Sequence, residues 1–472
     1  MKNSFSHAAP YIAQLKSIEQ QINQNQLQEA AQQLNRVAKT APHDPRLFLL
    51  GSRLAEAAGN PEGILKAARK AHQFAPQWPV ATMHLAGVLA NRDEAEEAMA
   101  LATQALQQAT TQVTQVGQAP QSSNPTELLI QAAAVAQRLN LHPQALQWLR
   151  QAEKVSPDDA NLRHQIARSL TNTGDYAGAI DIFTELLQQQ PDSQALLLDR
   201  LRACLNAQQT EQAVRDGEAL VALAPDHAVY PFYLDIARGL TPATQPASLV
   251  SGLFDGFAAR YDLHWVVQLQ YKLPRDVAQM IHDWHPDRKA DVLDLGCGTG
   301  LLGVCLGPIE GVLVGVDLSK GMIEQAGLHN VYDSFHQVNV PDALQATPEN
   351  LYHVITALDV FNYVGDLAPV VPNAYRILLP NGHFVFSCEA GAEGEADYTL
   401  QRTYRYTHQR SYVQRLLEQA GFKDIEMQDR VLRYEADQPV QGFLVTARKP
   451  PQVVKKAVAR KRVLKSAPPA SS

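Results

Sequence analysis

A glycine-rich turn at residues 291–300, DVLDLGCGTG, is the stretch of this sequence best suited to bind a small ligand. An apolar run ends at Leu295, and glycines follow at alternate positions, Gly296, Gly298 and Gly300. Glycine has no Cβ, so the backbone can approach a ligand where another residue would collide. The sequence predicts a buried strand before the turn and a helix after it, which is the context that a ligand-binding loop requires.

Two kinds of nucleotide ligand fit this turn. Residues 298–303 match G-x-G-x-x-G, and Asp317 follows Gly298 by 19 residues (317 − 298), near the spacing of an NAD-binding fingerprint. In that fold, however, the strand ends directly before the first glycine of the fingerprint, whereas here the apolar run ends before Gly296. Asp294 would also repel a pyrophosphate, while it favours a ligand that carries an amino group and a sulfonium. The second ligand is therefore preferred, and NAD(P) remains the alternative.

At this point the sequence resembles the class I S-adenosylmethionine-dependent methyltransferases, over about residues 251–448. The resemblance implies a Rossmann-like sheet of seven strands, with the last strand antiparallel, and S-adenosylmethionine as the cofactor. Two further stretches are similar to the subgroup that carries tetratricopeptide repeats before the methyltransferase domain, and loosely to malonyl-carrier-protein O-methyltransferases. The motifs are LDLGCGTG (293–300), VGVDLS (314–319), ALDVFNYV (357–364) and ILLPNGHFVFS (377–387), and the further stretches are 254–264 and 404–422.

Strands and helices should alternate after residue 290, as a doubly wound α/β sheet requires. Ligands of such sheets bind outside the carboxyl ends of the parallel strands, so the glycine turn lies where a cofactor would bind. Strands are predicted at 291–295, 312–316, 335–340, 352–358 and 382–388, late strands at about 425–434 and 441–448, and helices at 300–306, 319–328, 367–378 and 408–420.

The predicted cofactor residues follow from these strand ends and from the resemblance. Asp317 ends the second strand and could accept both ribose hydroxyls, unless it caps the next helix, a role that Ser319 could also fill. Asn339 stands where the family usually has an acidic residue that contacts adenine, so the contact is weaker or moves to Asp342. Asp359 is equally compatible with a turn cap. The set is Tyr261, Asp294, Gly296, Cys297, Gly298, Gly300, Asp317, Leu318, Met322, Asn339, Val340, Leu358 and Asp359; Tyr261 resembles the aromatic residue that covers the cofactor in relatives, with a core tyrosine as the alternative.

Methyl transfer from a sulfonium is an in-line displacement in which positioning matters most, and a hydroxyl or amine acceptor also benefits from a base. The densest polar cluster is TYRYTHQRSY, where alternation places Tyr404, Tyr406 and His408 on one side of an extended chain. His408 is predicted as the base or substrate anchor, with a surface histidine as the alternative. The predicted catalytic residues are His408, Tyr406 and His264, and Tyr363 and Glu389 are also expected to face the substrate.

Prolines in the first half of the chain recur with the period of tetratricopeptide repeats. Pro42 and Pro76 are 34 residues apart (76 − 42), and Pro157, Pro191 and Pro225 share that spacing (191 − 157; 225 − 191). This period predicts an all-α solenoid of helical hairpins over residues 11–240, whose groove binds a peptide or protein, or which serves only as a spacer or for self-association. The positions twelve before these prolines, where paired helices should approach most closely, are Ala30, Ile64, Ala145, Ala179 and Ala213.

The remaining segments and the composition complete the prediction. Residues 241–250 are expected to be a linker, 251–448 the methyltransferase domain, and 449–472 a disordered basic tail. A net charge of −7 argues against nucleic-acid binding apart from weak contacts of the tail. Four cysteines without C-x-x-C spacing predict no metal site, and the absence of a long apolar run predicts a cytoplasmic protein without membrane spans.

The function predicted from the sequence is S-adenosylmethionine-dependent methyl transfer, with the repeats recruiting a protein or carrier-bound substrate. The first alternative is a small-molecule O- or N-methyltransferase whose repeats only oligomerise. A non-catalytic adaptor and an NAD(P)-dependent oxidoreductase are the further alternatives. The sequence does not identify the methyl acceptor.

Overall fold

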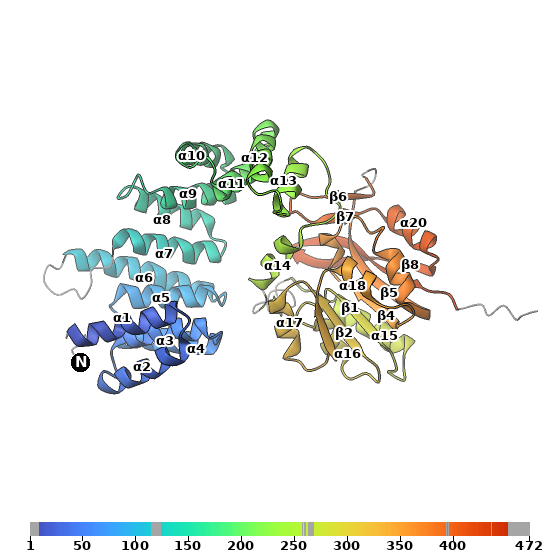
Figure 1. Ribbon diagram of the computed structural model, residues 1–472, viewed down its shortest axis with the longest axis horizontal. Coiled ribbons are helices and arrows are strands. Elements are labelled where there is room, and N and C mark those ends of the chain that lie inside the picture. Colours follow the sequence, from blue (N-terminus) through green and yellow to red (C-terminus); the bar gives the residue numbers. More distant parts are fainter. Residues whose placement is uncertain are drawn as a thin grey trace, which may run out of the picture. The chain divides into compact units, whose positions relative to one another are not determined.

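The computed structural model describes residues 9–114, 124–256, 258, 261–262, 269–392, 394, 396–435 and 437–451. It divides into two compact units, residues 1–238 and 239–472, here called the helical unit and the sheet unit (Figure 1). Most of the predicted basic tail lies outside the described residues. None of the helices in the described part of the chain combines the length and hydrophobicity that a bilayer span needs.

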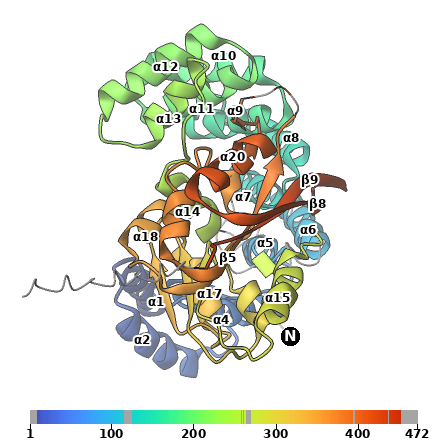
Figure 2. The ribbon, with the colours of Figure 1, turned by 90° about the vertical axis from the view of Figure 1, so that its right-hand side faces the viewer.

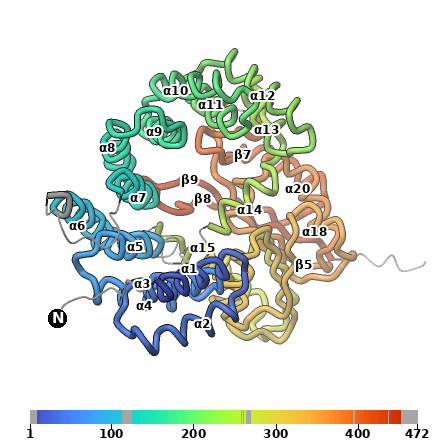
Figure 3. The backbone as a smooth tube through the Cα atoms, turned by 60° about the vertical axis from the view of Figure 1, so that its left-hand side comes forward, coloured from blue at the N-terminus to red at the C-terminus, as the bar shows by residue number. Residues whose placement is uncertain are grey.

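The described part of the helical unit is a succession of helices that pair as hairpins, and Figure 3 shows them stacked in a curved array. This arrangement confirms the predicted all-α solenoid. The helices are α1 (Ala9–Asn23), α2 (Leu27–Thr40), α3 (Pro45–Ala57), α4 (Pro61–Phe74), α5 (Pro79–Ala90), α6 (Ala95–Thr114), α7 (Pro125–Arg138), α8 (His142–Glu153), α9 (Ala160–Thr173), α10 (Tyr176–Gln189), α11 (Gln194–Asn206), α12 (Thr210–Leu223) and α13 (Val229–Ala237).

Small residues and helix caps define these hairpins. The predicted alanines Ala30, Ala145, Ala179 and Ala213 are all fully buried, whereas Ile64 is partly exposed. A methyl side chain lets two helix backbones approach closely. The 34-residue prolines lie in the turns between helices, and capping side chains such as Asp44, which accepts a hydrogen bond from the backbone N–H of Arg46, begin the next helix.

The sheet unit contains a mixed sheet with the strand order β3-β2-β1-β4-β5, parallel throughout, continued by β9 and then β8. β9 is antiparallel to β5, as predicted for the last strand, and the β8–β9 hairpin is drawn in dark red in Figure 2. The strands are β1 (Val292–Leu295), β2 (Leu313–Asp317), β3 (Ser334–Gln337), β4 (Tyr352–Ala357), β5 (Leu378–Ala390), β8 (Lys423–Glu435) and β9 (Gln438–Arg448).

Two short strands that the sequence did not predict extend this seven-stranded sheet. β7 (Tyr406–His408) pairs in parallel with the end of β5, and β6 (Tyr398–Leu400) pairs antiparallel with β7. β7 occupies the end of the TYRYTH stretch (403–408) that was expected to face a substrate. The helices of the unit are α14 (Ala247–Asp255), α15 (Leu273–Trp284), α16 (Leu301–Leu306), α17 (Lys320–Gly327), α18 (Val340–Ala346), α19 (Val371–Ile377) and α20 (Arg410–Ala420), with a 3₁₀ turn, η3 (Phe361–Tyr363).

Apolar side chains cover both faces of the sheet. All four residues of β1 are buried, as expected for an interior parallel strand. One face packs Val292 and Val354 against α15 and α16, and the other packs Leu293 and Ile355 against α18, α19 and α20. The carboxyl ends of the parallel strands are thereby held in fixed positions beside the glycine turn.

The predicted linker at 241–250 is built into the sheet unit. The backbone N–H groups of Gly365 and Asp366 donate to Ala243 O, and Gln245 N donates to Tyr363 O at 3.2 Å. Thr244 forms an antiparallel bridge with Val364. The boundary lies between residues 238 and 239, earlier than the end of the predicted linker at 250, because a Pro- and Thr-containing segment can also run as extended chain that pairs with another segment of the same unit. We call residues 242–255, from this bridge through α14, the strap.

Candidate functional site

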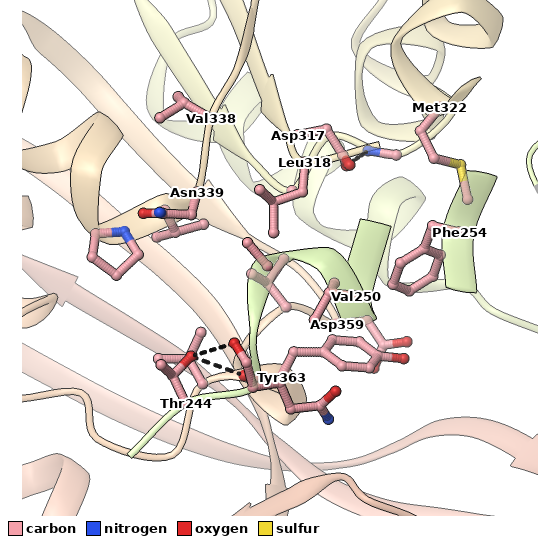
Figure 4. Close-up of a pocket in the computed structure, with 18 of the residues that line it drawn as sticks. Thr244, Val250, Phe254, Asp317, Leu318, Met322, Val338, Asn339, Asp359 and Tyr363 are labelled. Carbon is pink, nitrogen blue, oxygen red and sulfur yellow. Dashed lines mark hydrogen bonds between the residues drawn. The ribbon is translucent and has the colours of Figure 1, made fainter. Parts of the chain in front are cut away.

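A cavity of about 400 Å³ lies at the carboxyl ends of β1, β2 and β4, within the sheet unit (Figure 4). The strap forms one of its walls, and the glycine turn and the strand ends form the others. Its lining residues are Thr244, Gln245, Pro246, Ala247, Val250, Phe254, Tyr261, Gly296, Gly298, Asp317, Leu318, Met322, Val338, Asn339, Val340, Pro341, Asp342, Leu358, Asp359, Val360, Tyr363 and Val364.

Most of the predicted cofactor residues meet in this cavity. Those that line it are Tyr261, Gly296, Gly298, Asp317, Leu318, Met322, Asn339, Val340, Leu358 and Asp359. Asp294, Cys297 and Gly300 do not. The strap residues were missed, because their segment was predicted as a linker. Val338, Pro341, Val360 and Val364 were also missed, although their neighbours in sequence were predicted.

Asp294 is a correction to the sequence-based prediction, because its carboxylate is occupied within the fold. It is 3% exposed; its Oδ2 accepts from the Tyr332 hydroxyl and its Oδ1 from Thr356 Oγ1, both at 2.7 Å. Burial raises the pKa of Asp294 to about 6, although both hydrogen bonds act in the opposite direction. The side chain therefore links β1 to β4 and to Tyr332 beneath the turn instead of contacting a ligand directly.

Cys297 and Gly300 have structural roles in the turn. The Cys297 thiol is buried against Gly315, where an added Cβ would lie 2.9 Å from the sulfur. Gly300 has φ +87°, and an added Cβ would lie 3.2 Å from Ala326 Cβ. Both residues therefore pack against neighbouring parts of the sheet unit and do not line the cavity.

Gly298 is the glycine that leaves space on the cavity side. Its φ is +54°, and an added Cβ would meet nothing closer than Tyr261 Cε1 at 4.0 Å. At Gly296, in contrast, an added Cβ would lie 2.4 Å from Val360 Cγ2. The turn thus presents open backbone to the cavity at Gly298, which suits the close approach of a ligand.

Asp317 is held in place by the backbone, so its carboxylate has a fixed orientation. Its Oδ2 accepts from Gly298 N at 2.9 Å and its Oδ1 from Ser319 N at 2.8 Å. Ser319 caps α17, since its Oγ accepts from Met322 N at 3.1 Å. Burial raises the pKa of Asp317, and the backbone hydrogen bonds oppose that shift. Each carboxylate oxygen can accept a further hydrogen bond from a ligand in the cavity.

Asn339 and Asp342 together form the edge of the cavity at the start of α18. Asn339 Oδ1 accepts from Asp342 N at 2.8 Å, and Asn339 Nδ2 donates to Asp342 Oδ2 at 2.7 Å. The Asn339 amide is thereby held in one orientation, with its oxygen capping α18, and Asn339 also lines the cavity. The Asp342 carboxylate lines the cavity as well and also keeps acceptor capacity, so both of the predicted adenine contacts are compatible with this geometry.

Aromatic side chains enclose the cavity from the strap side. The Phe254 ring lies edge-on to Tyr363, with centroids 5.3 Å apart, and 6.3 Å from Tyr261. Burial raises the pKa of Tyr261 well above its usual value, so its hydroxyl stays neutral near pH 7. Figure 4 shows Phe254, Val250 and Tyr363 around the opening between the strap and the strand ends.

His408 and Tyr406, two of the predicted catalytic residues, do not reach the cavity. His408 is fully buried, with Nε2 2.9 Å from Gly365 O and 3.1 Å from Val364 O, so Nε2 carries the proton and donates. The Tyr406 hydroxyl donates to Pro242 O at 2.8 Å. Both side chains are packed in β7, so the structure gives His408 no role as a base. His264 lies outside the described residues.

Burial of His408 predicts a pH-dependent loss of stability. It lowers the pKa of His408 to about 4, so the neutral ring stabilises the fold above the ordinary pKa near 6.5, and this contribution is lost as the pH falls from 6.5 towards 4. At pH 5 the loss is about 2 kcal/mol of unfolding free energy. His408→Gln, whose amide can still donate to the two carbonyls, should show a flatter dependence of denaturant-induced unfolding between pH 7 and 5. The exposed His329→Gln serves as the control, and an equally steep slope in both variants would contradict the assignment.

Two family models match the chain, each in one of the two units. Residues 266–427 match a family described as "Methyltransferase domain", and residues 170–230 match "Tetratricopeptide repeat". These ranges agree with the order predicted from the sequence. Among the residues that the structure places, no three His, Cys, Asp or Glu side chains form a group that could hold a metal ion.

Individual relatives cover parts of the sheet unit. The ubiquinone biosynthesis O-methyltransferase of Pseudomonas savastanoi pv. phaseolicola is 27% identical over 142 residues, which are 28% of this chain and 60% of the relative. The same-named protein of Thiobacillus denitrificans is 29% identical over 182 residues, 33% of this chain and 78% of the relative. The chain thus spans about three fifths of the Pseudomonas relative. A 1,6-didemethyltoxoflavin-N1-methyltransferase structure from Burkholderia thailandensis superimposes with a TM-score of 0.35 and 19% identity, covering 44% of this chain and 92% of that one.

Proposed function

We propose that this chain, in which tetratricopeptide repeats precede a methyltransferase domain of the S-adenosylmethionine-dependent class, methylates an oxygen of a small molecule. The observation that carries the proposal is the cavity at the strand ends, where the open backbone of Gly298 and the oriented carboxylate of Asp317 lie side by side. When bound there, S-adenosylmethionine supplies an electrophilic methyl group.

The residues of the cavity fit the parts of such a cofactor. Asp317 would hold the ribose hydroxyls, Gly296 and Gly298 would lie against the amino-acid portion, and Leu318 and Met322 offer apolar surface to the adenine. Isothermal titration calorimetry with S-adenosylhomocysteine and NAD, side by side, tests the assignment. Binding of S-adenosylhomocysteine alone is expected, and binding of NAD alone would overturn it.

Oxygen in a small molecule is the acceptor that the two relatives described above support, since both are named ubiquinone biosynthesis O-methyltransferases. Asp359 and Tyr363 are the polar side chains at the end of β4 where an acceptor would meet the cavity. The chain, incubated with methyl-labelled cofactor and a fractionated cell extract, should label the small-molecule fraction. Label in the protein fraction would favour the second candidate below.

A second candidate is methylation of a protein or carrier-bound substrate that the repeats recruit. It is favoured by a groove of about 730 Å³ in the helical unit, lined by residues of α1, α3, α5 and α7, among them Arg53, Met83 and Arg138. Reversing two groove charges, Arg53→Glu with Arg138→Glu, should abolish labelling of such a substrate, whereas Arg150→Glu on the exposed face of α8 should not. Unchanged labelling with the groove variant would exclude recruitment through this surface.

Asp342 is expected to contact the adenine amine within this proposed site. Asp342→Ala should weaken S-adenosylhomocysteine binding by about tenfold (~1.4 kcal/mol), the value of a hydrogen bond to a charged acceptor. S-inosylhomocysteine has an oxygen in place of that amine, so the variant should bind the two ligands with more similar affinities than the parent does. The exposed Glu349→Ala is the matched control. An unaltered preference for the adenosyl ligand would exclude Asp342 from this role.

A further inference from the structure

Two aspartates that each follow an aromatic residue attach the segment 254–262, FDGFAARYD, to the ends of β1 and β2. Phe254 precedes Asp255, and Tyr261 precedes Asp262, which lies seven residues further on (262 − 255). Both aromatic side chains line the cavity, and each aspartate accepts a hydrogen bond from the residues that follow one of the two strands. The segment therefore contains the same arrangement twice, an aromatic ring at the cavity next to a carboxylate anchor.

The first anchor holds the segment to the start of α17, after β2. Asp255 Oδ1 accepts from Ser319 Oγ at 2.6 Å and from Gly321 N at 3.1 Å. Ala258, which is 7% exposed, packs at the same place, since its Cβ lies 3.1 Å from the position that a Cβ would take at Gly321. The part of the segment that follows Phe254 is thus fixed to α17.

The second anchor holds the other end of the segment to the glycine turn, after β1. Thr299 Oγ1 donates a hydrogen bond to Asp262 Oδ1. Thr299 is 1% exposed, so its hydroxyl is shielded from water and the hydrogen bond is stronger than one at the surface. Neither residue lines the cavity. This hydrogen bond therefore joins two parts of the chain beside the site and does not contact a ligand.

Asp317 links the places at which the two anchors attach. Its Oδ2 accepts from Gly298 N in the glycine turn, and its Oδ1 accepts from Ser319 N at the start of α17. The anchors at Asp255 and Asp262, together with Asp317, thus connect the segment and the two strand ends in one hydrogen-bonded network. A shift at one anchor changes how the segment lies over both strand ends.

Tyr261 is the side chain whose position depends most directly on the second anchor. Its Cε1 lies 4.0 Å from the position that a Cβ would take at Gly298, and its ring centroid is 6.3 Å from that of Phe254. The ring therefore borders the space over the open backbone of the turn. Because Asp262 is the next residue, its hydrogen bond to Thr299 fixes the backbone from which this ring projects.

We propose that Thr299 and Asp262 are positioning residues for the methyl donor, because their hydrogen bond holds the Tyr261 ring over the glycine turn. The inference rests on the proposed function, in which the donor lies against Gly298. A ring that is already held in place adds contact to a ligand without first losing conformational freedom, whereas a mobile ring must be ordered at the expense of affinity. The pair thus acts on the ligand through Tyr261.

Calorimetry with S-adenosylhomocysteine on the full chain tests the pair. Thr299→Val removes the hydroxyl at nearly constant volume and should weaken binding by about tenfold, in line with the loss of a hydrogen bond to a carboxylate. Thr299→Ser keeps the hydroxyl and should restore binding to that of the parent. Asp262→Ala should lose the same factor as Thr299→Val, and the double variant should lose no more than either single variant.

A cycle with Tyr261→Ala separates positioning of the ring from damage to the turn. Tyr261→Ala should itself weaken binding, and in that background Thr299→Val should have little further effect, because no ring remains to be positioned. A full tenfold loss in both backgrounds would mean that Thr299 acts on the glycine turn itself and would overturn the inference. Thr446→Val on β9 makes the same change at a buried threonine outside the cavity lining and is the control.

The remaining outcomes separate this inference from the proposed function. Parent-like binding by both Thr299→Val and Asp262→Ala would overturn the inference and leave the proposed function intact. If the parent does not bind S-adenosylhomocysteine, the proposed function itself fails. Thermal unfolding shows whether each variant folds, and because Thr299 and Asp262 belong to different segments, the cycle with Tyr261→Ala can be completed with either of them.

Discussion

Asp317→Asn is expected to weaken binding of S-adenosylhomocysteine by about 50-fold (~2.3 kcal/mol), because a carboxylate that accepts two ribose hydroxyls is replaced by an amide that can accept only one. The side chain cannot compensate by rotating, since Gly298 N and Ser319 N fix its two oxygens. Calorimetry on the full chain measures the loss. Glu324→Gln on the exposed face of α17, whose carboxylate lies 3.5 Å from Lys320, should bind as the parent does.

Ribose-deoxy analogues separate the two roles that Asp317 could have. If Asp317 binds the hydroxyls, removing one of them from the ligand should cost affinity in the parent and much less in Asp317→Asn. If Asp317 only orders the glycine turn through Gly298 N, the analogue should lose the same factor in both proteins. The second result would contradict the ribose assignment while leaving the cavity as the binding site.

The glycine turn and Asp317 could be predicted from the sequence. The glycines lie close together in the chain just after one strand, and Asp317 lies at the end of the next strand. Gly296 directly follows β1, Gly298 lies two residues further on, and Asp317 ends β2; adjacent parallel strands bring such ends together. The pattern of buried strands therefore predicts both the sheet and the edge at which the cavity lies.

Asp294 and His408 could not be placed in the same way, because their surroundings come from distant segments. The Asp294 partners, Tyr332 and Thr356, lie 38 and 62 residues away, and nothing local to LDLG indicates that they occupy its oxygens. His408 lies in extended chain, in β7, but its side chain meets the backbone carbonyls of Val364 and Gly365. Periodicity shows which residues share a side and not what that side meets.

The strap was missed for a related reason. Its composition at 241–248 fits a linker. The Tyr363 carbonyl, to which Thr244 Oγ1 donates a hydrogen bond, lies 119 residues later in the chain. Proline and threonine are equally compatible with an extended segment that pairs with a distant part of the same unit. A family match that begins at residue 266 also leaves this segment outside the domain. The wall of the cavity is thus the part of the site least visible in the sequence.

Replacing α14, residues 247–255, by a Gly-Ser segment of equal length in the full chain should abolish measurable binding of S-adenosylhomocysteine, a loss of at least about 100-fold. α14 contributes Val250 and Phe254 to the cavity, and burying two such side chains against a ligand is worth about 2–4 kcal/mol. The helix is anchored at its far end by Asp255 Oδ1, which accepts from Ser319 Oγ at 2.6 Å and from Gly321 N at 3.1 Å.

Point variants test the same wall without removing it. Asp255→Ala releases the anchor and should weaken binding by about tenfold, mainly through faster dissociation, in line with the loss of a hydrogen-bonded carboxylate. Leu253→Ser changes a side chain of the same helix that is 51% exposed and does not line the cavity, so it should bind normally. Thermal unfolding should show that the sheet unit stays folded in all three variants. Parent-like dissociation rates in Asp255→Ala and in the Gly-Ser replacement would mean that the ligand is held by the strand ends alone, and that α14 is not a wall of the site in solution.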